Sequence, residues 1–136
     1  MTDSPRIVLI HALEESVTPS RTAFREYWPE ALVFDLLDKS LAVDLAAAGH
    51  LDAAMTRRFV TLADYAATGS GAGGMPAGIL FTCSAFGPAI EAVKNRLAIP
   101  GFRPNEAAFR AALAQGDRIG LLVSFGPSAA ALSREL

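Results

Sequence analysis

The feature of the sequence that most constrains its fold is a succession of short apolar runs that alternate with segments of helical periodicity. The runs cover residues 6–11, 31–37, 79–81, 99–102 and 118–125. Runs that are apolar throughout are typical of strands buried on both faces. Strands that alternate with helices form parallel pairs. We therefore expect an α/β fold in three layers, with a mostly parallel sheet between helices.

The intervening segments carry the start and stop signals of helices. Helices are predicted from about residue 18 to 28, 40 to 48, 51 to 67, 104 to 115, and onward from 88 and from 127. Thr18 is a suitable N-cap, and both Pro19 and Pro88 suit the first turn of a helix, where a missing N–H leaves no bond unmade. Trp28, directly before Pro29, is expected to pack in the core or against the helix end.

Composition narrows the classes of partner. The 136 residues carry a net charge of -2 and no basic cluster, which argues against nucleic acid as a partner. No segment approaches the roughly 18 apolar residues that cross a bilayer, and the N-terminal run lacks the features of a signal peptide. The one cysteine excludes an internal disulfide framework and a cysteine-rich metal site, and it fits a reducing cytoplasm. We expect neither a metal nor a cofactor.

That cysteine, Cys83, is the leading candidate for chemistry. It follows the run ending at Phe81 and precedes a predicted helix, so it lies at the carboxyl end of a strand, where open α/β sheets bind ligands. A helix N-terminus favours the thiolate and lowers a thiol pKa. The hydroxyls of Thr82 and Ser84, with backbone N–H groups such as that of Ala85, are placed to hold a carboxylate. The alternative is that Cys83 is a small buried apolar residue.

His11 ends the first apolar run. With a strand order of 2-1-3 it lies beside Cys83 at the carboxyl edge of the sheet. There it can polarise the thiol or donate a hydrogen bond to a substrate, or it can simply cap a turn.

Three segments together resemble a known family. They are Leu37–Leu41 (LDKSL), Thr82–Ile90 (TCSAFGPAI) and Pro104–Ala107 (PNEA). The chain is similar to the aspartate/glutamate/hydantoin racemase superfamily, and more narrowly to its Asp/Glu racemase family protein branch. The resemblance implies a pair of flavodoxin-like domains with the active site between them. It also implies proton transfer alpha to a carboxylate by two cysteines, one from each domain, without a cofactor.

The same resemblance assigns roles to individual residues. Cys83 matches the first-domain cysteine, and Thr82 and Ser84 match the hydroxyl or amide positions around it. Ser124 matches a second-domain position that contacts the substrate carboxylate. Asn105 is a further substrate-binding candidate, although a capping role explains it equally well.

The chain also departs from the family. It has no second cysteine, and Ser84-Ala85 stands where glutamate racemases have Asn-Thr, which argues against an amino-acid substrate. The helical pattern still runs at Leu136 without a cap. We therefore expect a first domain over residues 1–103 and an incomplete second domain over 104–136.

The function we expect is a racemase or isomerase that acts on a small carboxylate, such as an amino acid, a hydantoin or a related acid, and that forms a homodimer. Because there is one cysteine, a single chain is not expected to perform two-base racemisation. A nucleophilic-cysteine hydrolase is the alternative enzyme, but Phe81 and Ala85 replace its flanking glycines, and His50 lies in a predicted inter-helix loop. A non-catalytic carboxylate-binding protein is the third alternative.

Overall fold

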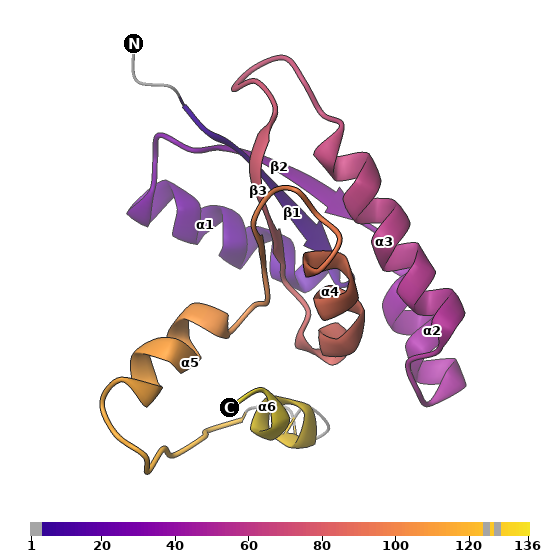
Figure 1. Ribbon diagram of the computed structural model, residues 1–136, viewed down its shortest axis with the longest axis vertical. Coiled ribbons are helices and arrows are strands. Elements are labelled where there is room, and N and C mark those ends of the chain that lie inside the picture. The colour runs from indigo at the N-terminus through magenta and orange to yellow at the C-terminus, as the bar shows by residue number, and fades with distance from the viewer. Residues whose placement is uncertain (1–3, 124–125, 127–128) are drawn as a thin grey trace.

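A four-stranded parallel sheet forms the centre of the protein. The computed structural model describes residues 4–123, 126 and 129–136. Within them the strands are β1 (Arg6–His11), β2 (Leu32–Leu37), β3 (Pro76–Phe81) and β4 (Gly101–Phe102). Their order is β2-β1-β3-β4, and every neighbouring pair is parallel (Figure 1). The expected flavodoxin-like α/β class, including the 2-1-3 order, is confirmed.

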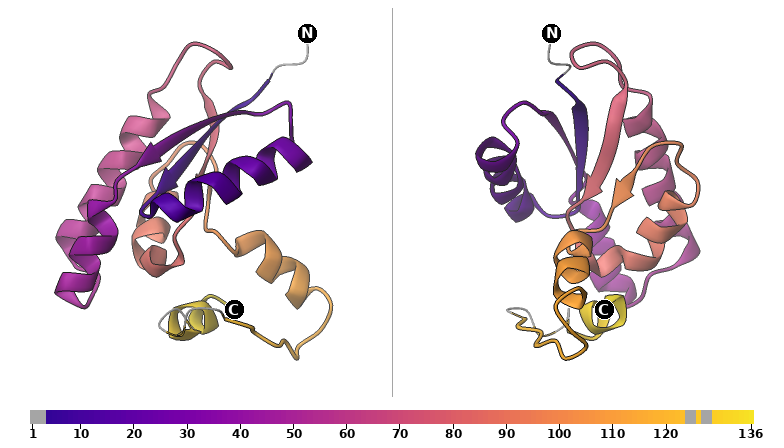
Figure 2. Two further views of the ribbon diagram at one scale, coloured as in Figure 1. Left: turned by 180° about the vertical axis from the view of Figure 1, so that it is seen from behind. Right: turned by 60° about the vertical axis from the view of Figure 1, so that its left-hand side comes forward.

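The structure contains two 3-10 turns and six α-helices in the described residues: η1 (Glu14–Ser16), η2 (Ser84–Phe86), α1 (Val17–Tyr27), α2 (Ser40–Ala48), α3 (Ala53–Ala67), α4 (Gly87–Lys94), α5 (Glu106–Leu113) and α6 (Ala129–Glu135). Helices lie on both faces of the sheet, and α5 and α6 lie away from it (Figure 1). Helix α1 covers one face, and α3 and α4 cover the other (Figure 2). None of the helices in the described residues is long and apolar enough to cross a membrane.

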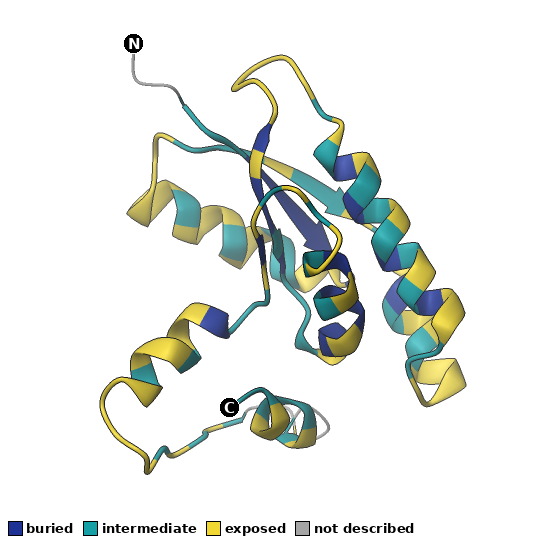
Figure 3. Cartoon of the chain, in the orientation of Figure 1, coloured by how far each residue is buried: buried dark blue, intermediate teal, exposed yellow. Residues whose placement is uncertain are grey.

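The main core lies between the sheet and helices α3 and α4, as the burial pattern shows (Figure 3). Side chains alternate along a strand, so Val8 and Ile10 of β1 point toward this layer. Phe59 of α3 is at its centre: its ring centroid lies 4.6 Å from that of Phe86 and 5.9 Å from that of Phe81. These three aromatic rings join α3 to β3 and to the turn that follows it.

Local capping moves two helix starts away from the predicted positions. The α1 helix begins at Val17 because η1 leads directly into it, so Thr18 lies inside the helix and is not its N-cap. The α3 helix begins at Ala53 because the Asp52 carboxylate accepts a hydrogen bond of 2.7 Å from the N–H of Met55. This is the standard side-chain cap of a helix N-terminus.

The strand predicted over residues 118–125 is wrong for the part that the structure describes. Residues 118–123 form no strand, and the side chain of Leu122 is fully exposed. A strand must pair its backbone N–H and C=O groups with a neighbour, and in the described residues no strand pairs with this run. Apolar composition alone was therefore not sufficient. Ser124 lies outside the described residues.

We predict that Phe59→Ala lowers the free energy of unfolding by about 3–5 kcal/mol, because it opens a cavity at the centre of the aromatic cluster. The matched control is Tyr65→Ala on the same helix, where the side chain is 69% exposed. That variant should change stability by about 0.5 kcal/mol or less. Urea denaturation measures both variants. Equal losses in the two would show that the core is not where the structure places it.

Candidate functional site

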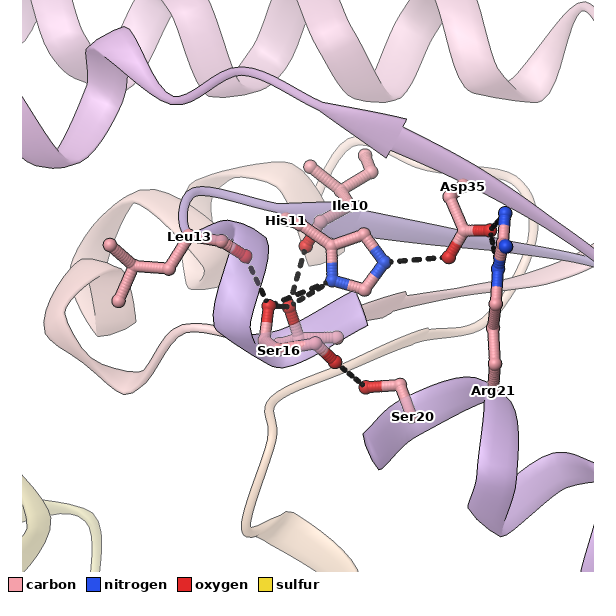
Figure 4. A network of polar contacts seen from close by, with 8 residues as sticks. Ile10, His11, Leu13, Ser16, Ser20, Arg21 and Asp35 are labelled. Carbon is pink, nitrogen blue, oxygen red and sulfur yellow. Dashed lines mark hydrogen bonds and ion pairs between the residues drawn. The ribbon is translucent and has the colours of Figure 1, made fainter. Parts of the chain in front are cut away.

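Polar side chains from three neighbouring strands meet near the carboxyl end of the sheet (Figure 4). The Nε2 atom of His11, at the end of β1, lies 2.8 Å from Oδ1 of Asp35 in β2. The Nδ1 atom of the same ring lies 2.7 Å from Oγ1 of Thr82, which directly follows β3. We call His11, Asp35 and Thr82 the three-strand tie.

Strand register explains why the three residues meet. Asp35 pairs with Leu9, so it shares a face of the sheet with residues 9 and 11 of β1. Ile10 pairs with Phe81, and the N–H of Thr82 donates to the carbonyl of Ile10 at 3.1 Å. All three polar side chains therefore lie on the α1 face.

The neighbouring helix supplies further partners for the tie. The hydroxyl of Ser16 lies 2.9 Å from Nδ1 of His11 and donates to the carbonyl of Leu13 at 2.7 Å. Nε of Arg21 in α1 donates to Oδ2 of Asp35 at 2.5 Å. Because a buried polar group without a partner is costly, these bonds are what allow a histidine to sit inside the fold.

The tie leaves no ring nitrogen for a ligand. The side chain of His11 is 0% exposed and that of Asp35 is 10% exposed. An ionised carboxylate only accepts hydrogen bonds, so Nε2 carries a hydrogen atom and donates a hydrogen bond to Asp35. In a neutral ring Nδ1 then accepts, and the hydroxyl of Thr82 is the nearer donor. His11 and Thr82 are thus bonded to one another rather than turned toward a substrate.

Cys83 lies on the opposite side of the sheet from the tie. Side chains alternate, so the residue after Thr82 points toward helices α3 and α4. There its half-buried side chain packs against the main core. Burial raises the pKa of the Cys83 thiol, and the N–H of Ala85 only partly opposes this by bonding to the sulfur. The expectation of a lowered thiol pKa is therefore wrong, because desolvation outweighs the single N–H.

The remaining candidate residues are placed as follows. Ser84 and Ala85 form the start of η2, with Ser84 half-buried and Ala85 exposed. Asn105 precedes α5, and its side chain makes no capping bond. Ser124, on which the carboxylate contact from the second domain depended, is not among the described residues. The structure thus brings Cys83, Ser84 and Ala85 into one turn, with His11 linked to that turn only through Thr82.

Sequence reasoning did not find the partners of His11. Asp35 stands inside an otherwise apolar strand, LVFDLL. A lone charged residue in a buried strand needs a polar partner, so this residue was the signal from which the contact could have been predicted. Arg21 and Ser16 carry no comparable signal, because both resemble ordinary surface residues of a helix start.

Two hollows on the surface of the described residues are lined by other segments. One lies between α1 and β2 and includes Arg21 and Trp28. The other is formed by the extended residues Arg118–Gly120. Neither includes Cys83. The Cys83 turn is therefore separate from both hollows.

The raised pKa gives a direct prediction for Cys83. The rate of alkylation by iodoacetamide follows the thiolate fraction, so its pH midpoint should be higher in the native chain than in the chain unfolded in urea. By linkage, the folded state should also lose stability as the pH rises above the pKa of the unfolded thiol, because folding disfavours the thiolate. Mass spectrometry of the single cysteine follows the alkylation. A native midpoint below the unfolded one would contradict the burial described above.

Comparison with protein-family models, with curated proteins and with solved structures finds no match to this chain. The functional argument therefore depends on the geometry of the three-strand tie and the Cys83 turn.

Proposed function

We propose that the protein is a cofactor-independent isomerase or racemase in which Cys83 transfers a proton on the carbon alpha to a carboxylate. The observation that carries the proposal is the position of Cys83. Its sulfur lies at the carboxyl end of β3, at the first turn before α4, and accepts a bond from the N–H of Ala85. This is the edge of an open α/β sheet at which ligands bind.

In this arrangement Cys83 enters the reaction as an acid. Its pKa is raised above an ordinary value of 9.0, so the thiol keeps its proton near neutral pH. Transfer of that proton to a substrate carbanion forms the new C–H bond and leaves a thiolate. The N–H of Ala85 and the N-terminus of α4 then stabilise the negative sulfur. Ser84 directly follows Cys83 at the start of η2, and we assign its hydroxyl to the substrate carboxylate.

A second group has to remove the original proton. The chain contains one cysteine, so two-base inversion needs a base from elsewhere. We propose that a homodimer supplies it: one of the two Cys83 side chains, in its thiolate form, takes the alpha proton and becomes a thiol, while the other, a thiol, gives its proton to the opposite face of the substrate and becomes the thiolate. A dimer would also place a second chain over the Cys83 turn. In a two-fold symmetric dimer both subunits present the same surface, which makes such pairing of identical residues natural.

The three-strand tie weighs against the hydrolase alternative. A nucleophilic cysteine is activated by a histidine within hydrogen-bond reach. Both ring nitrogens of His11 are bonded to other residues, and the ring of His50 contacts the carbonyl of Ala48. Neither histidine is arranged to accept a proton from Cys83. The geometry therefore favours proton transfer by the thiol itself.

Deuterium exchange tests the proposal. The full chain is incubated in D₂O with aspartate, glutamate or a 5-substituted hydantoin, and loss of the alpha-proton signal is followed by NMR. Cys83→Ser should lower the exchange rate by about a hundredfold or more, the usual size of an acid–base contribution. Ser133→Ala, an exposed position on α6, is the control and should leave the rate unchanged.

The same assay also tests whether a second chain supplies the base. The exchange rate per chain should rise with chain concentration if a dimer completes the site. Exchange that persists in Cys83→Ser, or an acyl adduct on Cys83 detected by mass spectrometry, would overturn the proposal; the adduct would identify a hydrolase.

A further inference from the structure

The hollow between α1 and β2 lies apart from the Cys83 turn and has the size of a small-molecule site. Its volume is about 420 Å³, within the range of roughly 300–1,000 Å³ that is usual for ligand pockets. Val33 of β2 and several residues of α1 line it. Because β2 is an edge strand, its outer backbone groups are open toward this side of the sheet.

Aromatic rings line the wall of this hollow. Phe24 and Trp28 lie one helical turn apart, with ring centroids 6.2 Å apart and planes inclined by 24°. The helix ends at Trp28, whose backbone N–H donates to the carbonyl of Phe24 at 2.8 Å. Pro29 prevents the helix from continuing. Trp28 therefore packs against the helix end, as expected, yet stays 43% exposed. The exposed ring offers a flat apolar surface.

Positive charge lies beside these rings. Arg21 and Arg25 are among the residues that line the hollow. Asp35 compensates the charge of Arg21. Arg25 donates to the hydroxyl of Thr22 at 3.2 Å, and no carboxylate of the described residues lies within 4.0 Å of it. Arg25 thus adds an uncompensated positive charge beside the aromatic rings. A ligand that fits both features carries an aromatic ring and a negative charge.

We propose that this hollow binds a small planar aromatic acid. The ring of the ligand packs against Phe24 and Trp28, and its acidic group pairs with the guanidinium of Arg25. A planar guanidinium pairs with carboxylates and phosphates in the same two-point geometry, so aromatic carboxylates and nucleoside monophosphates share the required chemistry. The site is independent of the reaction proposed for Cys83.

An NMR titration of the full chain tests this site. Trp28 is the only tryptophan, so its indole N–H gives one signal that needs no assignment. The probes are 2-naphthoate and its uncharged counterpart 2-naphthamide. Arg25 is exposed, and an exposed ion pair contributes up to about 1 kcal/mol, so the acid should bind about fivefold more tightly than the amide. Arg25→Gln should abolish this difference and leave amide binding unchanged.

Further variants and ligands separate the outcomes. Phe24→Ala removes a lining ring but keeps the Trp28 reporter, and it should weaken binding of both probes. Arg57→Gln, on the exposed side of α3, should affect neither. Binding of AMP that is tighter than that of 2-naphthoate and lost in Arg25→Gln supports the site and identifies the nucleotide form of the ligand. Equal binding of acid and amide, or full acid binding by Arg25→Gln, overturns the proposal. A shift of the indole signal with protein concentration alone also overturns it, because a second chain would then cover the hollow.

Discussion

A buried histidine with a bond on each ring nitrogen is the constraint on which the rest of the structure depends. His11 ends the central strand of the sheet and is bonded to Asp35 on one side and Thr82 on the other. Removing such a side chain from water is favourable only when its hydrogen bonds are made inside the protein. The three-strand tie therefore fixes the carboxyl ends of β1 and β3 relative to each other and to β2. Because Thr82 directly precedes Cys83, the tie also fixes the position of the backbone at Cys83.

Alternation of side chains continues past the end of β3, through Thr82 and Cys83, and divides this edge into two environments. Thr82 faces the polar tie under α1, and Cys83 faces the apolar layer under α3 and α4. This explains why the imidazole does not touch the sulfur, and why burial raises the thiol pKa. A donor thiol fits that environment better than a resting thiolate. The same division leaves the α1 side to a different kind of site, in which Arg25 and Trp28 take part.

The sequence predicted the parts of the fold that depend on local patterns. Buried runs followed by helical segments correctly indicated four parallel strands, and the strand order placed His11 near the carboxyl edge. The failed strand at residues 118–123 shows the limit: pairing is a tertiary property that composition does not contain. The prediction of a lowered thiol pKa was wrong for a similar reason, because the pKa depends on which face of the sheet Cys83 occupies. Asp35 and Thr82, the partners of His11 in the three-strand tie, are distant from it in the sequence. Of these two, only Asp35 has a recognisable sequence signal, because it is a charged residue within an apolar strand.

A double-mutant cycle on Asp35→Asn and Thr82→Val tests most directly whether the three-strand tie acts as one unit. Asp35 sets which ring nitrogen carries the proton, and that proton sets the direction of the bond from Thr82. The two substitutions should therefore be coupled by about 1 kcal/mol or more in the free energy of unfolding, although the two side chains bind opposite sides of the ring. The control pair, Thr82→Val with the exposed Thr61→Val, should be additive. Additive losses for Asp35→Asn and Thr82→Val would show that the imidazole does not join the strands in the way described.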